Sequence, residues 1–425
     1  MPEHRLTELE SGVRVVTEAM PSVRSVALGF WIRTGSRAET PAQAGLSHFL
    51  EHLLFKGTER YSSTEIDELF DGMGAEINAG TGKETTSVYA RLLDRHLETA
   101  FDVMADMVLR PAYHDVDAER QVVIEEIAMY EDEPSDKVHD VLARAVFGDH
   151  PLGRPIIGTA EVVGSVPVEE IAAYHDARYT GCNLVVAAAG SVDHDRLVEL
   201  VRERCATEPG EPNAVEPAPD EVEPRLCFHA KETEQYHLCV GGRGLARADE
   251  RRWALRVLDT ILGGSTSSRL FQEVREKRGL AYSVYSYASQ YADTGQVAIY
   301  VGTRPDNVAE AMEVIAGELR RLQTEPVSEE ELTRAKENLK GRTTLGMEST
   351  LARMNRLGSS TLMGVPLLSL DETLARIDAV DAEMVTELAR ELFAPERLSA
   401  AAVGASEDAF RAAVAPLNPE LARAA

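Results

Sequence analysis

The stretch that decides how this chain is interpreted is His48-Phe49-Leu50-Glu51-His52. Helical spacing of about 100° per residue places the two histidines one turn apart on one face, so both imidazoles can reach one metal ion. Glu51 lies beside them and can hold a water molecule. The order HxxEH is the inverted form of the HExxH motif of zinc peptidases. The alternative is a surface helix with two unrelated histidines, because five-residue matches also occur by chance.

The motif is predicted to lie on a helix that runs from Thr40-Pro41 to about Lys56. Thr40 is a good helix cap, and proline is favoured at the first helical position. The face opposite the histidines carries an apolar stripe made of Leu46, Leu50 and Leu53. The pattern therefore predicts a helix that packs on a core and presents its polar motif on the other side.

A zinc site that performs chemistry needs a third protein ligand and an open position for water. A helix predicted at 118–131 offers Glu126, whose neighbours one turn away are apolar: Val122, Val123, Met129 and Tyr130. A carboxylate on an apolar face costs of the order of several kcal/mol unless it is paired or bound to metal. Glu126 is therefore preferred as the third ligand over Glu125, which lies at the edge of that face. Glu119 lies two turns before Glu126 and is predicted to orient a ligand or the substrate. The alternative for Glu126 is a buried ion pair with an arginine.

Length and charge limit the possible classes of protein. The 425 residues are too many for one core, so two or more domains are expected. Asp and Glu number 71 against 44 Lys and Arg, which gives a net charge of −27. That charge argues against nucleic acid or an anionic membrane as partner. It favours basic peptides if it lines the working surface, and plain solubility is the alternative.

No part of the sequence indicates export or a membrane anchor. The first residues contain neither an apolar segment nor an arginine-rich amphipathic arm, and no apolar run approaches the length of a membrane span. The four cysteines show no CxxC spacing: Cys182, Cys205, Cys227 and Cys239. We expect a cytoplasmic protein with reduced thiols and no cysteine metal site.

The chain reads as two copies of one α+β unit. A segment rich in proline and glutamate, 207–224, separates an N-terminal domain at 1–206 from a C-terminal domain at 225–425. Seven predicted helices and strands recur in the same order on both sides. Where the first copy has the histidine motif, the second has Arg252-Trp253-Ala254-Leu255-Arg256-Val257-Leu258. The metal site is therefore assigned to the N-terminal domain.

Several motifs together resemble the pitrilysin/insulinase family of zinc peptidases, the inverzincins, over nearly the whole chain. They are His48 to Thr58, Glu126 placed 74 residues after His52, Asn78-Ala79, Pro151-Leu152-Gly153, Gly263 to Phe271, and Arg275 with Tyr282 seven residues later. Within the family the chain is similar to the small-subunit group that includes the mitochondrial processing peptidase and its bacterial relatives.

The resemblance implies a fold of two homologous domains, each an antiparallel sheet packed with helices, as in the processing peptidases. It implies one Zn²⁺ per subunit, with His48, His52 and Glu126 as ligands and Glu51 and Glu119 as catalytic residues. The edge strand around Asn78-Ala79 would receive the substrate. Arg275 and Tyr282 would reach an active site from the opposite half of a closed chamber, and hence from a partner subunit, either a second copy or a paralogue.

The implied activity is zinc-dependent endopeptidase hydrolysis of peptides or unfolded segments. The main rival is a non-catalytic partner or scaffold subunit of the same family, which usually lacks part of the zinc set. A zinc deaminase would need a cysteine-rich ligand set, and the sequence has none.

Overall fold

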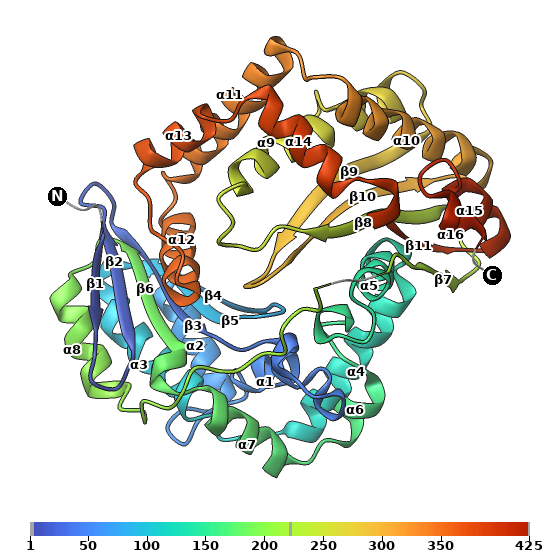
Figure 1. The fold of residues 1–425 in the computed structure, drawn as a ribbon. Coiled ribbons are helices and arrows are strands. Elements are labelled where there is room, and N and C mark those ends of the chain that lie inside the picture. Colours follow the sequence, from blue (N-terminus) through green and yellow to red (C-terminus); the bar gives the residue numbers. More distant parts are fainter. Residues whose placement is uncertain (1–3, 221–222, 424–425) are drawn as a thin grey trace. The chain divides into compact units, whose positions relative to one another are not determined.

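The computed structural model describes residues 4–220 and 223–423. The chain forms two compact units, each of which is described by itself (Figure 1). Unit 1 comprises Met1–Ala128, Pro155–Glu216 and Thr344–Ser369, and unit 2 comprises Met129–Arg154, Pro217–Thr343 and Leu370–Ala425. None of the helices in the described part has the length and apolar character that crossing a membrane requires.

Unit 1 is built on a six-stranded sheet. Its strands lie in the order β1 (Arg5–Glu8), β2 (Arg14–Ala19), β6 (Leu184–Gly190), β3 (Ser25–Ile32), β5 (Thr86–Leu93) and β4 (Glu76–Thr81). The predicted hairpin is present as β1 and β2, and Gly12 in its turn has φ +82°, which glycine adopts without strain. Neighbouring strands are antiparallel except for the parallel pair β2 and β6.

Unit 2 repeats this sheet with one strand fewer. The order is β7 (Leu226–Ala230), β11 (Ser399–Gly404), β8 (Tyr236–Gly244), β10 (Gly295–Thr303) and β9 (Ala281–Gln290). Each strand occupies the place of its counterpart in unit 1, and the pair β7 and β11 is again parallel. The α+β class and the two homologous domains are confirmed. Purely antiparallel sheets were a wrong expectation, because β6 and β11 each return through helical crossovers, which allow parallel pairing.

The helices of unit 1 lie along the chain around this sheet. They are α1 (Leu46–Leu53), α2 (Ser63–Met73), α3 (Leu97–Leu109), α4 (Val116–Asp132), α6 (Ala160–Ser165), α7 (Val168–Arg178) and α8 (His194–Arg204). Phe30 of β3 stacks on Phe101 of α3 at 5.5 Å between ring centroids, in a core that also buries the apolar side of α1. This packing fixes α1 against the sheet.

The helices of unit 2 follow the same plan. They are α9 (Arg252–Leu262), a π-helix (Phe271–Glu276), α10 (Val308–Thr324), α11 (Glu329–Gly346), α13 (Leu370–Asp378), α14 (Ala382–Leu392), α15 (Glu407–Val414) and α16 (Pro419–Arg423). The segments 160–178 and 370–392 each form two helices, α6 with α7 and α13 with α14, and Pro167 and Asp381 cap the second helix in each. The corresponding breaks are further evidence of the repeat.

Each sheet is covered on one face by a helix from the other half of the chain. α12 (Thr350–Met363) packs on the sheet of unit 1, where Trp31 Nε1 donates to Met354 Sδ at 3.3 Å. Glu18, buried in β2, pairs there with Arg356 at 3.0 Å and also with Arg353. α5 (Pro134–Phe147) packs on the sheet of unit 2, in a cluster with strands β8, β10 and β11. α12 therefore belongs to unit 1 although it lies in the C-terminal half of the sequence, and α5 belongs to unit 2 although it lies in the N-terminal half.

The segment predicted as a linker is bound to unit 1 over its first part. Gly181 N donates to Glu208 O at 3.0 Å, and the Asn183 side chain donates to Glu211 O at 2.8 Å. The Asn213 side chain donates to Arg33 O at 2.8 Å. Residues 207–216 therefore follow a defined path over unit 1 through hydrogen bonds to backbone groups rather than through secondary structure.

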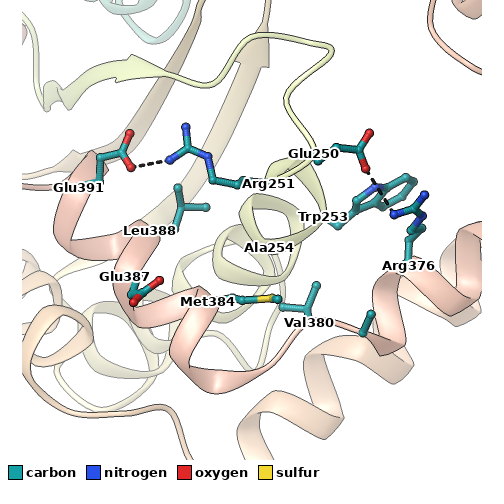
Figure 2. A pocket seen from close by; sticks show the side chains of 11 residues that line it. Glu250, Arg251, Trp253, Ala254, Arg376, Val380, Met384, Glu387, Leu388 and Glu391 are labelled. Atoms are coloured by element: carbon teal, nitrogen blue, oxygen red, sulfur yellow. Dashed lines mark hydrogen bonds and ion pairs between the residues drawn. The ribbon is translucent and has the colours of Figure 1, made fainter.

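The two units differ in the connection before their first helix. In unit 1 residues 33–45 join β3 to α1, and Arg178 of α7 donates to Ala38 O in this segment at 2.8 Å. In unit 2 only residues 245–251 join β8 to α9. A cavity of about 390 Å³ lies there between α9, α13 and α14, with ion pairs at its rim between Arg251 and Glu391 and between Arg376 and Glu250 (Figure 2).

Candidate metal centre

The helix that carries the histidine motif begins later than its sequence predicts. α1 starts at Leu46, after Gly45 with φ +99°, and Thr40 caps only a short 3-10 turn at Pro41–Gln43. The Glu39 carboxylate accepts from the N–H groups of Gly45 at 2.9 Å and Ser47 at 2.7 Å. The predicted start was wrong because this buried carboxylate, rather than Thr40, satisfies the free N–H groups of the first turn.

α1 presents two faces, as its periodicity predicts. Leu46, Leu50 and Leu53 are buried in the core of unit 1. His48 and His52 project from the other side one turn apart, and their ring centroids are 4.7 Å from each other. Burial, and then the neighbouring His52, lowers the pKa of His48 to about 4. His48 is therefore neutral at physiological pH, which is the form that binds metal.

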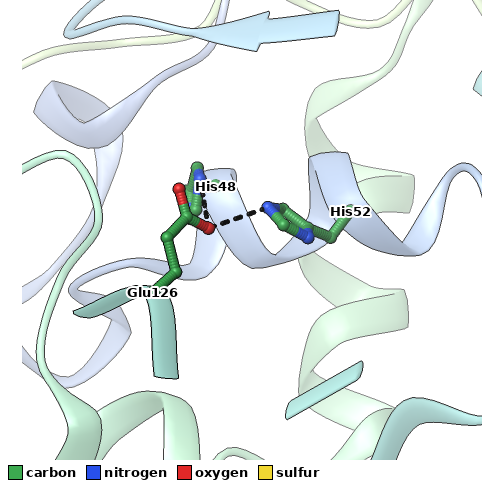
Figure 3. A group of neighbouring side chains, drawn as sticks. All are labelled: His48, His52 and Glu126. Carbon is green, nitrogen blue, oxygen red and sulfur yellow. Dashed lines mark ion pairs between the residues drawn. The ribbon is translucent and has the colours of Figure 1, made fainter. Parts of the chain in front are cut away.

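α4 brings Glu126 to the two histidines (Figure 3). Its Oε2 atom lies 3.3 Å from His52 Nε2 and 3.7 Å from His48 Nε2. One donor atom from each of the three residues lies within 4.8 Å of the other two. The arrangement depends on α1 and α4 together, since neither helix alone carries three ligands.

The reason that favoured Glu126 in the sequence does not hold in the structure. Two of its neighbours on α4, Val122 and Met129, are 52% and 63% exposed, and the Glu126 side chain is itself 26% exposed. The buried stripe of α4 runs instead through Val123 and Ile127. Glu126 thus lies at the edge of the buried face, where it is accessible to an ion and to solvent.

Glu119 connects the metal-binding face of α1 to α4. It is buried, and its Oε1 lies 2.8 Å from Nδ1 of His52 while its Oε2 pairs with Lys56 Nζ at 2.6 Å. Nδ1 of His52 donates to this carboxylate, so Nε2 keeps its lone pair on the side that faces Glu126. Lys56 balances the charge of Glu119, and sequence reasoning assigned it no role, although it lies one turn after His52.

Glu51 lies between the histidines in sequence and accepts a hydrogen bond from Thr81 Oγ1 at the end of β4. Burial raises the pKa of Glu51, against the opposing effects of the Thr81 hydrogen bond and of His52. A carboxylate with a raised pKa is a stronger base at neutral pH. Thr81 is a contact that sequence reasoning missed, because it depends on how the sheet edge meets α1.

The donor set fits zinc. Two imidazole nitrogens and one carboxylate form the ligand set of many catalytic zinc sites, which keep a fourth position for water or substrate. His48, His52 and Glu126 supply that set within reach of one ion, and Glu119 provides the hydrogen bond to a ligand histidine that such sites use. Glu51 lies on the same helix face as the two histidines, so it borders the fourth position.

Asn78 and Ala79 lie on β4, the outer strand of the unit 1 sheet, as the sequence predicts. β4 pairs only with β5 among the described strands, which leaves its other edge unpaired. The same strand ends at Thr81, which contacts Glu51. The edge strand and the metal-binding residues are therefore linked in one unit, and binding of substrate by Asn78 and Ala79 stays a prediction.

Arg275 and Tyr282 belong to unit 2, so the structure does not place them in the group formed by the three ligands. They contact each other. The Arg275 guanidinium lies 4.4 Å from the centre of the Tyr282 ring and 4.6 Å from that of Phe271. Tyr282 is 78% exposed. Arg275 lies on the π-helix, a form often found at functional positions, and the role of both residues stays a prediction.

The fold and the site define the class of protein as an α+β protein of two homologous units with a metallopeptidase ligand set in the first. Two family descriptions match the chain. Insulinase (Peptidase family M16) matches residues 14–160, and Peptidase M16 inactive domain matches residues 165–339. The chain belongs to peptidase family M16, the pitrilysin/insulinase family.

Curated relatives are similar over almost their whole length. An uncharacterized zinc protease of Streptomyces coelicolor is 45% identical over 417 residues, which is 95% of this chain and 90% of that protein. An uncharacterized zinc protease of Bacillus subtilis is 44% identical over 386 residues, with 90% and 94% covered. The names of these relatives support a zinc protease family.

Solved structures share the fold at lower identity. A protease from Helicobacter pylori aligns with a TM-score of 0.90 at 22% identity, over 95% of this chain and 99% of that chain. A chain of Complex III2 from Candida albicans aligns with a TM-score of 0.84 at 20% identity, over 97% and 99%. The fold is thus found both in a protease and in a chain of Complex III2.

Proposed function

We propose that this chain is a zinc-dependent endopeptidase that hydrolyses peptides or unfolded segments. The observation that carries the proposal is the group of His48, His52 and Glu126 with Glu51 beside it. The three candidate ligands and the candidate base lie in one unit, and the Glu119 carboxylate lies within hydrogen-bond distance of Nδ1 of His52, which supports the proposal. We propose one Zn²⁺ per subunit, with these three residues as its ligands.

Zinc bound by these ligands would lower the pKa of a water molecule from about 15.7 toward roughly 7 and would polarise the peptide carbonyl. Glu51 would take a proton from the attacking water and would pass it to the nitrogen of the leaving amine. Its raised pKa suits both steps, since the group must accept a proton and then release it.

The unpaired edge of β4 supports a mode of substrate binding. An extended peptide would add to the sheet as a further strand beside Asn78 and Ala79, through backbone hydrogen bonds that tolerate many side chains. Thr81 on this strand already contacts Glu51, so a peptide paired with β4 would run toward the catalytic base. The chain's net charge of −27 favours basic peptides over acidic ones.

We also propose that the active form is a dimer, either of two copies or with a paralogous subunit. Arg275 and Tyr282 of one subunit would complete the site of the other, Arg275 by donating to a substrate carbonyl and Tyr282 by donating to the oxyanion. The exposure of Tyr282 supports this role, because a side chain 78% exposed is free to contact another molecule, and the Arg275 side chain beside it is 33% exposed. The four free cysteines support a reducing, cytoplasmic location.

The substitution Glu51→Gln tests the proposed chemistry. It keeps the shape of the side chain and the contact with Thr81, but it removes the base. We expect turnover of an internally quenched basic peptide to fall by about 10²- to 10⁴-fold while zinc content stays unchanged. A Glu51→Gln protein that holds zinc and still cleaves at the wild-type rate would refute the mechanism.

A second candidate function is that of a non-catalytic partner or scaffold subunit. It is favoured by the match of residues 165–339 to an inactive domain and by the likeness to a chain of Complex III2. The intact ligand set argues against it.

A mixture of Glu51→Gln and Tyr282→Phe proteins tests whether one subunit completes the site of another copy. After subunit exchange, a mixed dimer would have one site with both Glu51 and Tyr282, and the mixture would regain up to about a quarter of wild-type activity.

A further inference from the structure

The place in unit 2 that corresponds to the metal centre can be identified from the burial of α9. The buried positions 46, 47, 49, 50, 53 and 54 in and just after α1 match the buried positions 254, 255, 257, 258, 261 and 262 of α9. The one difference within α9 is Thr260, which is buried where His52 is half-buried. In this register His48 corresponds to Arg256, Glu51 to Asp259 and His52 to Thr260. The sequence comparison had set the counterpart at Arg252–Leu258, one turn too early.

The second helix of the site can be matched in the same way. α5 begins at Pro134 and α12 at Thr350, a spacing of 216 residues. Four buried positions of α5, at 138, 142, 145 and 146, correspond at this spacing to the buried positions 354, 358, 361 and 362 of α12. Applied to the preceding helices, this spacing places the buried Val123 of α4 at Leu339 of α11, which is also buried. Glu126 then corresponds to Arg342. Two ligand positions of the metal centre are therefore arginines in unit 2.

A cavity of about 380 Å³ lies at this place in unit 2. It is lined by Arg256, Asp259, Thr260, Gly264, Leu339, Arg342 and Thr343. The positions of all three ligands and of the base thus line one cavity. The matched positions thus lie around one cavity, and the chemical character of their side chains differs from that of the metal centre.

Among the described residues, no carboxylate lies at ion-pair distance from Arg256 or Arg342. Arg342 is exposed. Arg256 is half-buried, its Nη2 lies 3.5 Å from Thr343 Oγ1, and its guanidinium stacks at 5.5 Å over the Trp253 ring. Burial, and then the charge of Arg342, lowers the pKa of Arg256. Two like charges share this cavity, in a protein whose net charge is −27.

Asp259 does not neutralise this pair by direct contact. Its Oδ1 accepts from Ser286 Oγ at 2.6 Å, and no guanidinium lies within ion-pair distance of it in the described part of the chain. Burial raises the pKa of Asp259 to about 6. The carboxylate therefore reduces the positive potential of the cavity without filling the space between the guanidinium groups.

We propose that this cavity binds an oxyanion, the phosphate or carboxylate group of a small molecule, between Arg256 and Arg342. The planar fork of a guanidinium donates two parallel hydrogen bonds to such a group, and Thr343 offers a hydroxyl beside them. The bound anion supplies the counter-charge that the two arginines lack. This inference does not depend on zinc or on peptidase activity.

The test is isothermal titration calorimetry of the full-length protein with inorganic phosphate and, separately, with succinate. Sodium chloride at matched ionic strength is the control for non-specific charge screening. We expect saturable binding of at least one oxyanion and none of chloride. Tighter binding of phosphate would assign the site to phosphate compounds, and tighter binding of succinate would assign it to carboxylates. Failure of both oxyanions to bind more than chloride overturns the proposal.

Three variants locate the binding. Arg256→Gln and Arg342→Gln are each expected to weaken it by about tenfold or more, since each removes a charge-assisted hydrogen-bond donor. Arg320→Gln, at an exposed position on α10, is the matched control and should bind as wild type does. Asp259→Asn removes the opposing charge and should tighten binding several-fold. Binding that is unchanged in both cavity arginine variants, with their fold verified by circular dichroism, would refute the site.

Discussion

Unit 1 and unit 2 each combine a sheet with a corresponding pair of helices, α1 with α4 and α9 with α11. At the place where the two helices of a pair meet, unit 1 presents metal-binding side chains and unit 2 presents two arginines. Unit 1 holds two imidazoles and a carboxylate, and unit 2 holds two guanidinium groups and a threonine. An imidazole nitrogen offers a lone pair to a metal, whereas a guanidinium offers only N–H donors. The repeated fold therefore supplies a position for a ligand, and three side chains decide whether that ligand is a cation or an anion.

The order of elements along the chain supports the same comparison. In unit 1 α1 follows β3, and α4 follows β5 and α3. In unit 2 α9 follows β8, and α11 follows β10 and α10. Buried positions of α1 correspond to buried positions of α9, and the buried Glu119 and Val123 of α4 correspond to the buried Ala335 and Leu339 of α11, so a substitution in one unit can be matched by position in the other. The predictions below use this correspondence.

The largest effect is expected at the third ligand. Glu126→Gln removes the negative charge of the ligand set, and we expect the purified protein to lose its zinc and its hydrolysis of a quenched peptide, with affinity lowered by more than about 100-fold. Glu125→Gln is the matched control, because Glu125 is exposed next to it on α4. Equal zinc content in the two variants, measured by atomic emission, would contradict the assignment.

A transplanted site tests whether the two positions are equivalent. The triple substitution Arg256→His, Thr260→His and Arg342→Glu puts the ligand set of unit 1 at the matched positions of unit 2. We expect a folded protein that binds a second zinc ion per chain, because the helix geometry is shared. A folded triple variant that still binds only one zinc would break the proposed correspondence.

A smaller effect is expected at Glu119, which holds Nδ1 of His52 and pairs with Lys56. Glu119→Gln keeps an acceptor for the imidazole but loses the charge. Zinc affinity should fall by about 10- to 100-fold, the range for partners that orient a metal ligand. Competition with a chelator of known affinity measures the change. An affinity equal to that of wild type would show that Glu119 serves only to balance Lys56.

Some features of the site follow from the sequence for clear physical reasons. The juxtaposition of His48 and His52 depends on helical spacing alone, which the apolar stripe of α1 already defines. Glu126 was selected correctly as a neighbour of the histidines, but from an apolar face that the structure leaves largely exposed. Glu126 lies near the histidines as expected, although the cost of a buried carboxylate, on which the choice rested, does not apply to a side chain that is 26% exposed.

Other features depend on tertiary contacts that no local pattern encodes. The start of α1 is set by Glu39, whose carboxylate returns to the helix from the preceding loop. The contact of Thr81 with Glu51 needs the edge of the sheet to meet α1. The packing of α5 on the sheet of unit 2 and of α12 on the sheet of unit 1 is also a tertiary contact. Both helices are amphipathic, and their sequences do not specify which of the two sheets they cover.

The most direct test of the central claim is a titration of zinc into metal-free wild-type protein, with hydrolysis of a quenched basic peptide measured at each addition. The account predicts that activity is absent without metal, rises in proportion to added zinc, and reaches its maximum at one equivalent per chain. Activity that persists in protein verified to be free of metal, or no activity at any level of bound zinc in the assembled protein, would contradict it.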